Sequence, residues 1–138
     1  MKIMAIDFGD ARTGIAISDI TGFITGETMV VQSYNPEKAA NEIAEIVKSR
    51  YVDRIVLGYP RNMDGSLGPR AEKSAAFAEV LRELTQLEVV LWDERRTTID
   101  AHRILSENSR HGKKRKEKVD AVAASLILEG YLGFLKNQ

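Results

Sequence analysis

The chain of 138 residues contains no cysteine. Disulfides and thiolate metal sites are therefore excluded, and any bound metal ion must use oxygen or histidine ligands. Only two histidines are present, His102 and His111, and their spacing is not that of a zinc-binding pair. Net charge is also lacking, because twenty basic residues balance twenty acidic ones. Any attraction for nucleic acid must therefore come from local clusters of charge.

Long apolar runs are missing as well. No stretch is long enough to span a membrane, and the amino-terminal segment lacks the apolar region of a secretory signal. We therefore expect a cytoplasmic protein. The length fits one domain over residues 1–138, and a chain of this size buries roughly two-thirds of the surface that its unfolded form exposes.

Apolar runs bounded by turn residues predict five strands, at 2–7, 14–18, 24–33, 54–57 and 89–92. The first three follow one another closely, as strands joined by hairpins do, whereas the last two are separated by helical segments. Hairpins followed by strand–helix–strand crossovers predict an α/β fold with a mixed sheet of five strands and helices on both faces.

Four helices are expected between and after these strands. Asn35 and Pro36 are typical of a helix start, and Pro69 begins a second helix that ends near residue 86. A third is expected at about 98–107. The polar, basic stretch 108–116 is predicted to be a mobile loop, and the last helix is expected from about 117 to 135. Its buried stripe is predicted to comprise Val119, Val122, Ala123, Leu126, Ile127 and Phe134.

Three acidic residues stand where the ends of these elements should meet. Asp7 closes the first strand, Glu94 follows the fifth, and Asp120 is expected in the first turn of the last helix. Sites in such sheets form at the carboxyl ends of strands. Crowded carboxylates need a compensating cation, and Mg²⁺ or Mn²⁺ prefers oxygen ligands. Two such ions, ~3.5–4 Å apart, can activate a water molecule and stabilise a leaving oxygen during phosphodiester hydrolysis.

Each acid also has a structural interpretation. Asp7 could stabilise the tight turn toward Gly9. Glu94 could form a surface ion pair with Arg95. Asp120 could interact with the positive end of its helix, worth ~0.3–1 kcal/mol. The prediction of a metal-dependent nuclease site at Asp7, Glu94 and Asp120 therefore depends on the three acids together.

Basic residues and glycine near the acids are candidates for substrate binding. Gly9 lets the backbone turn and a phosphate approach, and Arg12 is a forked donor suited to phosphate, although it could simply be an exposed turn residue. Arg95 stands at a strand-to-helix joint, where a helix amino terminus can hold phosphate. Lys116 and Lys118 belong to a basic run before Asp120 that suits backbone binding, or else a solvated loop.

The loop after the fourth strand contains one more acid. Asp64 is followed by Gly65, and an Asp-Gly pair is a strong turn signal. The loop belongs at the same edge of the sheet, so it could line a substrate groove, but most such loops only connect elements. Whether Asp64 takes part in the site stays open.

Four motifs together resemble the YqgF family, also called RuvX, of the RNase H-like superfamily. They are residues 6–16 (IDFGDARTGIA), 58–66 (GYPRNMDGS), 93–98 (DERRTT) and 116–128 (KEKVDAVAASLIL). The resemblance implies an RNase H-like fold and an activity on nucleic acid. That activity is either maturation of the 5′ end of pre-16S ribosomal RNA or resolution of Holliday junctions. It also implies catalytic roles for Asp7, Glu94 and Asp120.

Two other functions are compatible with parts of the sequence. An Asp-x-Gly strand turn also occurs in phosphotransferases and ATPases, although these use two such domains around a nucleotide. A non-catalytic module that binds RNA or a protein partner is the other alternative. The sequence does not choose between structured RNA and branched DNA, between Mg²⁺ and Mn²⁺, or between a monomer and a homodimer.

Overall fold

A computed structural model describes residues 1–22, 24–60, 68–93 and 112–137, with the side chains of the last range described from residue 120. The described strands form one five-stranded sheet in the order β3-β2-β1-β4-β5. Its strands are β1 (Ile3–Asp7), β2 (Arg12–Ser18), β3 (Thr25–Gln32), β4 (Arg54–Tyr59) and β5 (Val89–Asp93). The described helices are α1 (Pro36–Arg50), α2 (Pro69–Thr85) and α4 (Gly112–Lys136).

The sheet is mixed, as the sequence predicts. β2 runs antiparallel to both β1 and β3, whereas β4 runs parallel to both β1 and β5. The hairpins account for the antiparallel pairs, and α2 makes the crossover between β4 and β5. The carboxyl ends of β1, β4 and β5 consequently lie at one edge of the sheet.

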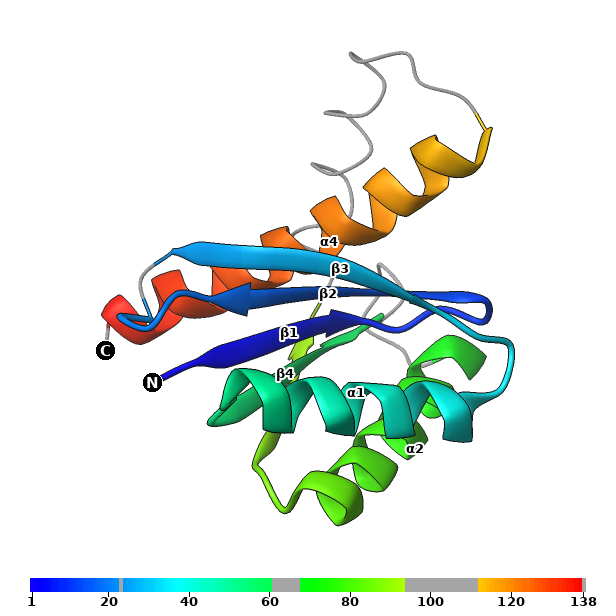
Figure 1. Cartoon of the computed structure of the whole chain (residues 1–138), viewed down its shortest axis with the longest axis horizontal. Helices are drawn as coiled ribbons and strands as arrows, with labels where there is room; N and C mark the ends of the chain where they lie inside the picture. Colours follow the sequence, from blue (N-terminus) through cyan, green and yellow to red (C-terminus); the bar gives the residue numbers. More distant parts are fainter. Residues whose placement is uncertain (23, 61–67, 94–111, 138) are drawn as a thin grey trace.

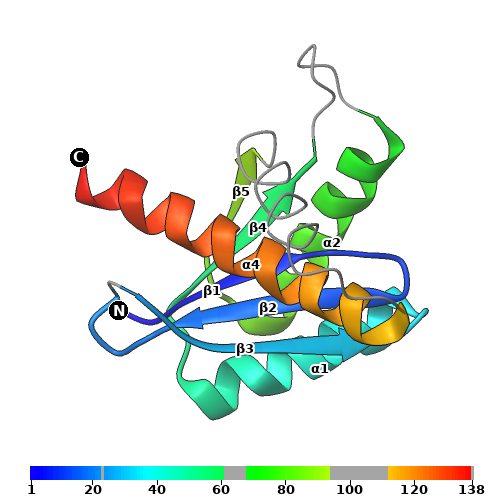
Figure 2. The same ribbon diagram turned by 90° about the horizontal axis from the view of Figure 1, so that it is seen from above.

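Helices cover both faces of the sheet, which confirms the predicted architecture (Figure 1). α1 and α2 pack on one face, where Met4, Ile6, Ile15 and Leu57 are fully buried. α4 crosses the other face, as the view from above shows (Figure 2). The buried strand residues on that face include the small side chains of Ala5, Ala16 and Val56. The small side chains allow α4 to approach the strands closely.

Local sequence explains the bounds of α1. The Asn35 side chain accepts hydrogen bonds from the backbone N–H groups of Glu37 and Lys38, and Pro36 occupies the first turn. The helix ends at Tyr51, whose φ of 55° lies in the left-handed region. The start of the helix agrees with the interpretation of the sequence.

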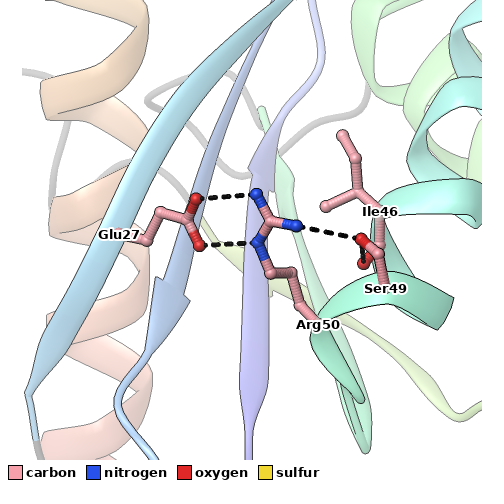
Figure 3. A network of polar contacts seen from close by, with 4 residues as sticks. All are labelled: Glu27, Ile46, Ser49 and Arg50. Carbon is pink, nitrogen blue, oxygen red and sulfur yellow. Dashed lines mark hydrogen bonds and ion pairs between the residues drawn. The ribbon is translucent and has the colours of Figure 1, made fainter.

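An arginine at the end of α1 joins this helix to the edge strand β3 (Figure 3). The Nε and Nη2 atoms of Arg50 donate to the two carboxylate oxygens of Glu27, at 2.9 and 3.0 Å. Arg50 Nη1 also donates to the Ser49 hydroxyl, which itself donates to the carbonyl of Ile46. The hydrogen bonds from Arg50 hold the pKa of Glu27 below its usual value, with a smaller contribution from the Arg50 charge.

This ion pair makes a pH-dependent contribution to stability. Because the pKa of Glu27 is lowered on folding, the pair stabilises the protein fully above the ordinary glutamate pKa of ~4.3. The contribution disappears as the pH falls through the lower pKa of the folded state. We expect Glu27→Gln to be slightly less stable than the parent at neutral pH and to match it in acid. Urea unfolding from pH 7 to pH 3 measures the difference, and a gap that widens toward acid would contradict the assignment.

The last helix begins earlier than predicted. α4 starts at Gly112, so residues 112–116 are helical and not part of a loop, and Asp120 is not in the first turn. Lysine, arginine and glutamate are good helix formers, and the basic run therefore lengthens the helix at its amino-terminal end. The predicted loop at 108–111 and helix at 98–107 lie outside the described residues.

The buried stripe of α4 also differs from the prediction. Of the predicted residues whose side chains are described, Ile127 alone is fully buried and Phe134 is exposed, while the side chain of Val119 lies outside the described part. The stripe is rotated because the helix is apolar on more than one side, which leaves its orientation ambiguous in the sequence. The buried residues observed are Ala124, Ile127, Leu128, Tyr131 and Leu132.

β4 extends beyond the predicted end at Leu57. Gly58 and Tyr59 pair with Trp92 and Asp93 of β5, so Gly58 does not stop the strand.

Within the described ranges, no helix is both long and apolar enough to cross a membrane.

Candidate active site

Asp7 is the last residue of β1, at the edge where the parallel strands end. Successive side chains of a strand point to opposite faces of the sheet. Ile3 and Ala5 belong to the core under α4, whereas Met4 and Ile6 belong to the core under α1 and α2. Asp7 therefore lies on the α4 face, where it is half-buried.

Asp120 reaches the same place from the distant end of the chain. Asp7 pairs with Gly14 of β2, and α4 crosses β2 directly over that glycine. A Cβ atom at Gly14 would lie 2.0 Å from the Asp120 carbonyl oxygen and 3.2 Å from the Asp120 Cα. Paired residues of an antiparallel ladder lie only ~4.5–5.5 Å apart between Cα atoms. The backbone of Asp120 is consequently packed beside Asp7.

Arg12 contributes a positive charge to this pair of acids. Its Nε donates to Asp120 Oδ2 at 3.1 Å. The side chains of Arg12 and Asp120 are 31% and 18% exposed, so their interaction is less screened than that of a surface pair. The predicted phosphate donor is thus in the site, but its Nε is directed to a carboxylate of the protein.

Gly9 is needed for the turn that joins β1 to β2. A Cβ atom at this position would lie 2.3 Å from the carbonyl oxygen of Arg12. Any side chain there would force the turn open and move Arg12. At Gly9 the backbone of the turn therefore comes as close as a glycine allows. That Gly9 also leaves room for a phosphate stays a prediction.

Glycines stand on both neighbouring strands beside Asp7. Gly14 lies on β2, where the backbone of α4 covers it. Gly58 lies on β4. Ile6 pairs with Leu57, so Gly58 is the residue of β4 beside Asp7, and it is on the same face as Val56. Glycine inside a strand often marks a close backbone or ligand approach. A glycine within or directly after a predicted strand is therefore the sequence signal that points to Gly14 and Gly58.

Several predicted site residues are not placed by the structure. Glu94, Arg95 and Asp64 lie outside the described residues, although Glu94 directly follows the end of β5. Lys116 and Lys118 lie in the amino-terminal part of α4, and only their backbone is described. Among the described side chains, no group of three acids or histidines is arranged to hold a metal ion. The structure therefore brings Asp7, Asp120 and Arg12 together and leaves Glu94 untested.

Solved structures of resolvases share this arrangement of strands and helices. Fowlpox virus resolvase, solved with Holliday junction DNA, superposes with a TM-score of 0.61 and 15% identity, covering 98% of this chain and 99% of that one. Thermus thermophilus RuvC, solved with a Holliday junction substrate, gives 0.58 and 12%, covering 96% of each chain. The protein therefore has an RNase H-like fold of the RuvC type, with an acidic residue, Asp7, at the end of its first strand.

The sequence itself defines the family more narrowly. The family model for RuvX, described as a Holliday junction resolvase, matches residues 1–133. A protein of Halothermothrix orenii named "Putative pre-16S rRNA nuclease" is 44% identical over 134 residues, which cover 97% of this chain and 96% of the relative. The chain belongs to the RuvX family. The resemblance stated from its four motifs is thereby confirmed.

Proposed function

We propose that this protein is a metal-dependent nuclease that hydrolyses phosphodiester bonds at Asp7, Glu94 and Asp120. The observation that carries the proposal is the packing of the Asp120 backbone on Gly14, the strand partner of Asp7. It brings together two acids that are far apart in the sequence. The names of the relatives favour pre-16S ribosomal RNA as the substrate, and we propose that its 5′ end is the part processed. The family description and the resolvase fold favour a Holliday junction as the alternative.

The residues present suit a divalent cation. Carboxylate oxygens are the ligands that Mg²⁺ and Mn²⁺ prefer, and the described part of the site supplies them from Asp7 and Asp120. When bound, such ions would supply charge to activate water and stabilise the leaving oxygen. Arg12 provides a compensating positive charge for Asp120.

Glu94 is proposed as the third acid because of where β5 ends. β4 lies between β1 and β5, so the end of β5 is ~10 Å from β1 across two strand spacings. Gly58 carries no side chain on the intervening strand. We propose that carboxylates at the ends of β1 and β5 therefore meet over β4.

The protein's own groups would position the substrate. Arg12 keeps two terminal guanidinium nitrogens besides the Nε that contacts Asp120, and a guanidinium fork matches the geometry of phosphate. Arg95, Lys116 and Lys118 are proposed to contact the backbone of a structured RNA or branched DNA, and Gly9 to leave room beside Asp7. We further propose one domain over residues 1–138 that acts in the cytoplasm, as a monomer or homodimer.

The direct test compares cleavage of a structured precursor ribosomal RNA with cleavage of a four-way DNA junction. Both are incubated with Mg²⁺ or Mn²⁺, with a chelator in parallel. We expect metal-dependent cleavage of the RNA. Cleavage of the junction alone would favour resolution of DNA junctions. Binding of either substrate without cleavage would favour a non-catalytic binding module.

Arg12→Gln separates substrate binding from metal binding. Loss of one charge-assisted hydrogen bond, worth ~1.5–3 kcal/mol, should raise the KM about 10-fold or more. The metal concentration for half-maximal activity should not rise, because the variant removes a cation that competes for Asp120. Steady-state kinetics at several metal concentrations measure both quantities. A higher metal requirement with an unchanged KM would instead show that Arg12 mainly orients Asp120.

Replacing both Lys116 and Lys118 by alanine tests the basic part of α4. Each phosphate contact contributes ~0.9 to the slope of log K against log salt. We expect the double variant to bind more weakly at low salt and to show a slope that is shallower by about 2. The difference from the parent should fade at high salt. An unchanged slope in a binding titration would exclude these lysines from the interface.

A further inference from the structure

A pocket lies at the same edge of the sheet as Asp7 and Asp120, but on the opposite face. Its volume is about 420 Å³, and its lining comes from the residues after β1, the segment before α1, and α2. This volume is within the range of small-molecule sites, ~300–1,000 Å³. Phe8, which follows Asp7 in the chain, forms part of the wall. The pocket and the acids therefore lie on the two faces of one strand end.

The lining is mainly apolar and partly aromatic. The ring of Phe8 stacks on that of Phe77, with centroids 4.0 Å apart and planes inclined by 11°. Ala76 and Val80 continue the wall along α2. Tyr34 also lines the pocket and is 88% exposed. An exposed aromatic ring beside an apolar pocket is suited to stacking with a flat ring.

Charged groups at the pocket restrict what can enter it. Asp10 and Glu37 contribute carboxylates, and Lys73 Nζ lies 3.4 Å from Asp10 Oδ1. Two acids against one lysine disfavour a phosphate inside the pocket. Carboxylates do accept hydrogen bonds from exocyclic amino groups, as they do from N4 of cytosine. The chemistry therefore favours a neutral flat ring that carries an amino group.

We propose that this pocket receives an unpaired nucleobase that flanks the scissile phosphodiester, with preference for adenine, cytosine or guanine over uracil or thymine. The proposal depends on the proposed function only in taking nucleic acid as the ligand. A strand whose phosphodiester lies at Asp7 would reach the pocket by continuing around the end of β1 to Phe8, the next residue, which lies on the opposite face. Stacking of a base on an aromatic side chain is tolerant of sequence, and the carboxylates add the preference for amino groups.

The test is binding of short single-stranded RNA oligomers of adenine, cytosine or uracil, without divalent metal. We expect the adenine and cytosine oligomers to bind about 10-fold more tightly than uracil, because their amino groups can donate a hydrogen bond to a carboxylate of the pocket. Ala76→Trp fills the pocket from an exposed helix position and should abolish this preference. Tyr34→Ala should reduce binding of all three oligomers. Leu84→Trp, on the same helix outside the pocket, is the matched control and should bind like the parent.

Cleavage assays of the same variants separate this proposal from the proposed function. If the parent cleaves RNA or junction DNA while Ala76→Trp binds all three oligomers as the parent does, the pocket proposal is wrong and the nuclease proposal stands. If the parent cleaves neither substrate but its base preference is lost in Ala76→Trp, the pocket proposal stands without the nuclease. Equal binding of adenine, cytosine and uracil by the parent would overturn the assigned preference.

Discussion

Replacing Asp7 by asparagine is expected to lower the cleavage rate at least ~100-fold. Loss of a group that only supports a metal ligand already costs ~10–100-fold, and Asp7 is proposed to be a direct ligand. Asparagine keeps the shape of the side chain but removes its negative charge. Asp7 is half-buried at the end of β1 and away from the fully buried core, so the fold should persist. Rates under single-turnover conditions measure the effect.

Asp53→Asn is the matched control for this experiment. Asp53 precedes β4 at the opposite end of the sheet, where its carboxylate accepts a hydrogen bond from the backbone N–H of Lys2 at 2.8 Å. An asparagine oxygen can accept the same bond. We expect the rate of Asp53→Asn to equal that of the parent. If Asp7→Asn also cleaved at the parent rate while remaining metal-dependent, the site would have to be elsewhere.

Replacing Gly14 by alanine is expected to cause the largest loss of stability among these variants. The new Cβ would lie 2.0 Å from the carbonyl oxygen and 2.5 Å from the carbonyl carbon of Asp120. These are backbone atoms, so no side chain can rotate away and α4 itself must move. Overpacking of this kind costs ~1–3 kcal/mol, and we expect ~3 kcal/mol here. Thermal unfolding should show a Tm lower by ~10 °C.

Gly133→Ala, which lies in α4, is expected to have the opposite effect on stability. In the described part of the chain, and apart from the neighbouring backbone of α4 itself, no atom lies within 4 Å of a Cβ built at Gly133, so alanine meets no obstacle there. Alanine in a helix is more stable than glycine by ~0.5–1 kcal/mol. A small rise in Tm is therefore expected for Gly133→Ala. If Gly14→Ala were as stable as the parent, the close contact between α4 and β2 would be wrong, and with it the placement of Asp120.

Much of the fold could be predicted from local patterns. The strand periods and the turn residues predicted five strands and a mixed sheet, and Asn35 with Pro36 predicted the start of α1. The beginning of α4 could not be predicted in the same way. Its basic run has the composition of a solvated loop and also the propensity of a helix. The apolar residues of α4 likewise did not determine which side of the helix is buried.

The sequence could nominate Asp7 and Asp120 as candidates for the site but could not give their geometry. Asp7 and Asp120 could be chosen because one follows an apolar strand and the other begins an apolar helical run. That Asp120 packs over the strand partner of Asp7 depends on the crossing point of α4, which only the packed sheet defines. The contact between Arg12 and Asp120 spans the chain from β2 to α4. Such a contact leaves no signal in the residues around either partner.

The sequence by itself determined the class of fold and the family, because hydrophobic periodicity, turn residues and linked motifs are properties of short segments. The tertiary structure decided which residues meet. It placed Asp120 beside Asp7, directed Arg12 to Asp120, and formed the pocket lined by Phe8 and Phe77 on the other face. The physical reason is that these contacts follow from how closely α4 and α2 approach the sheet. That approach is set by the volumes of side chains from several strands at once.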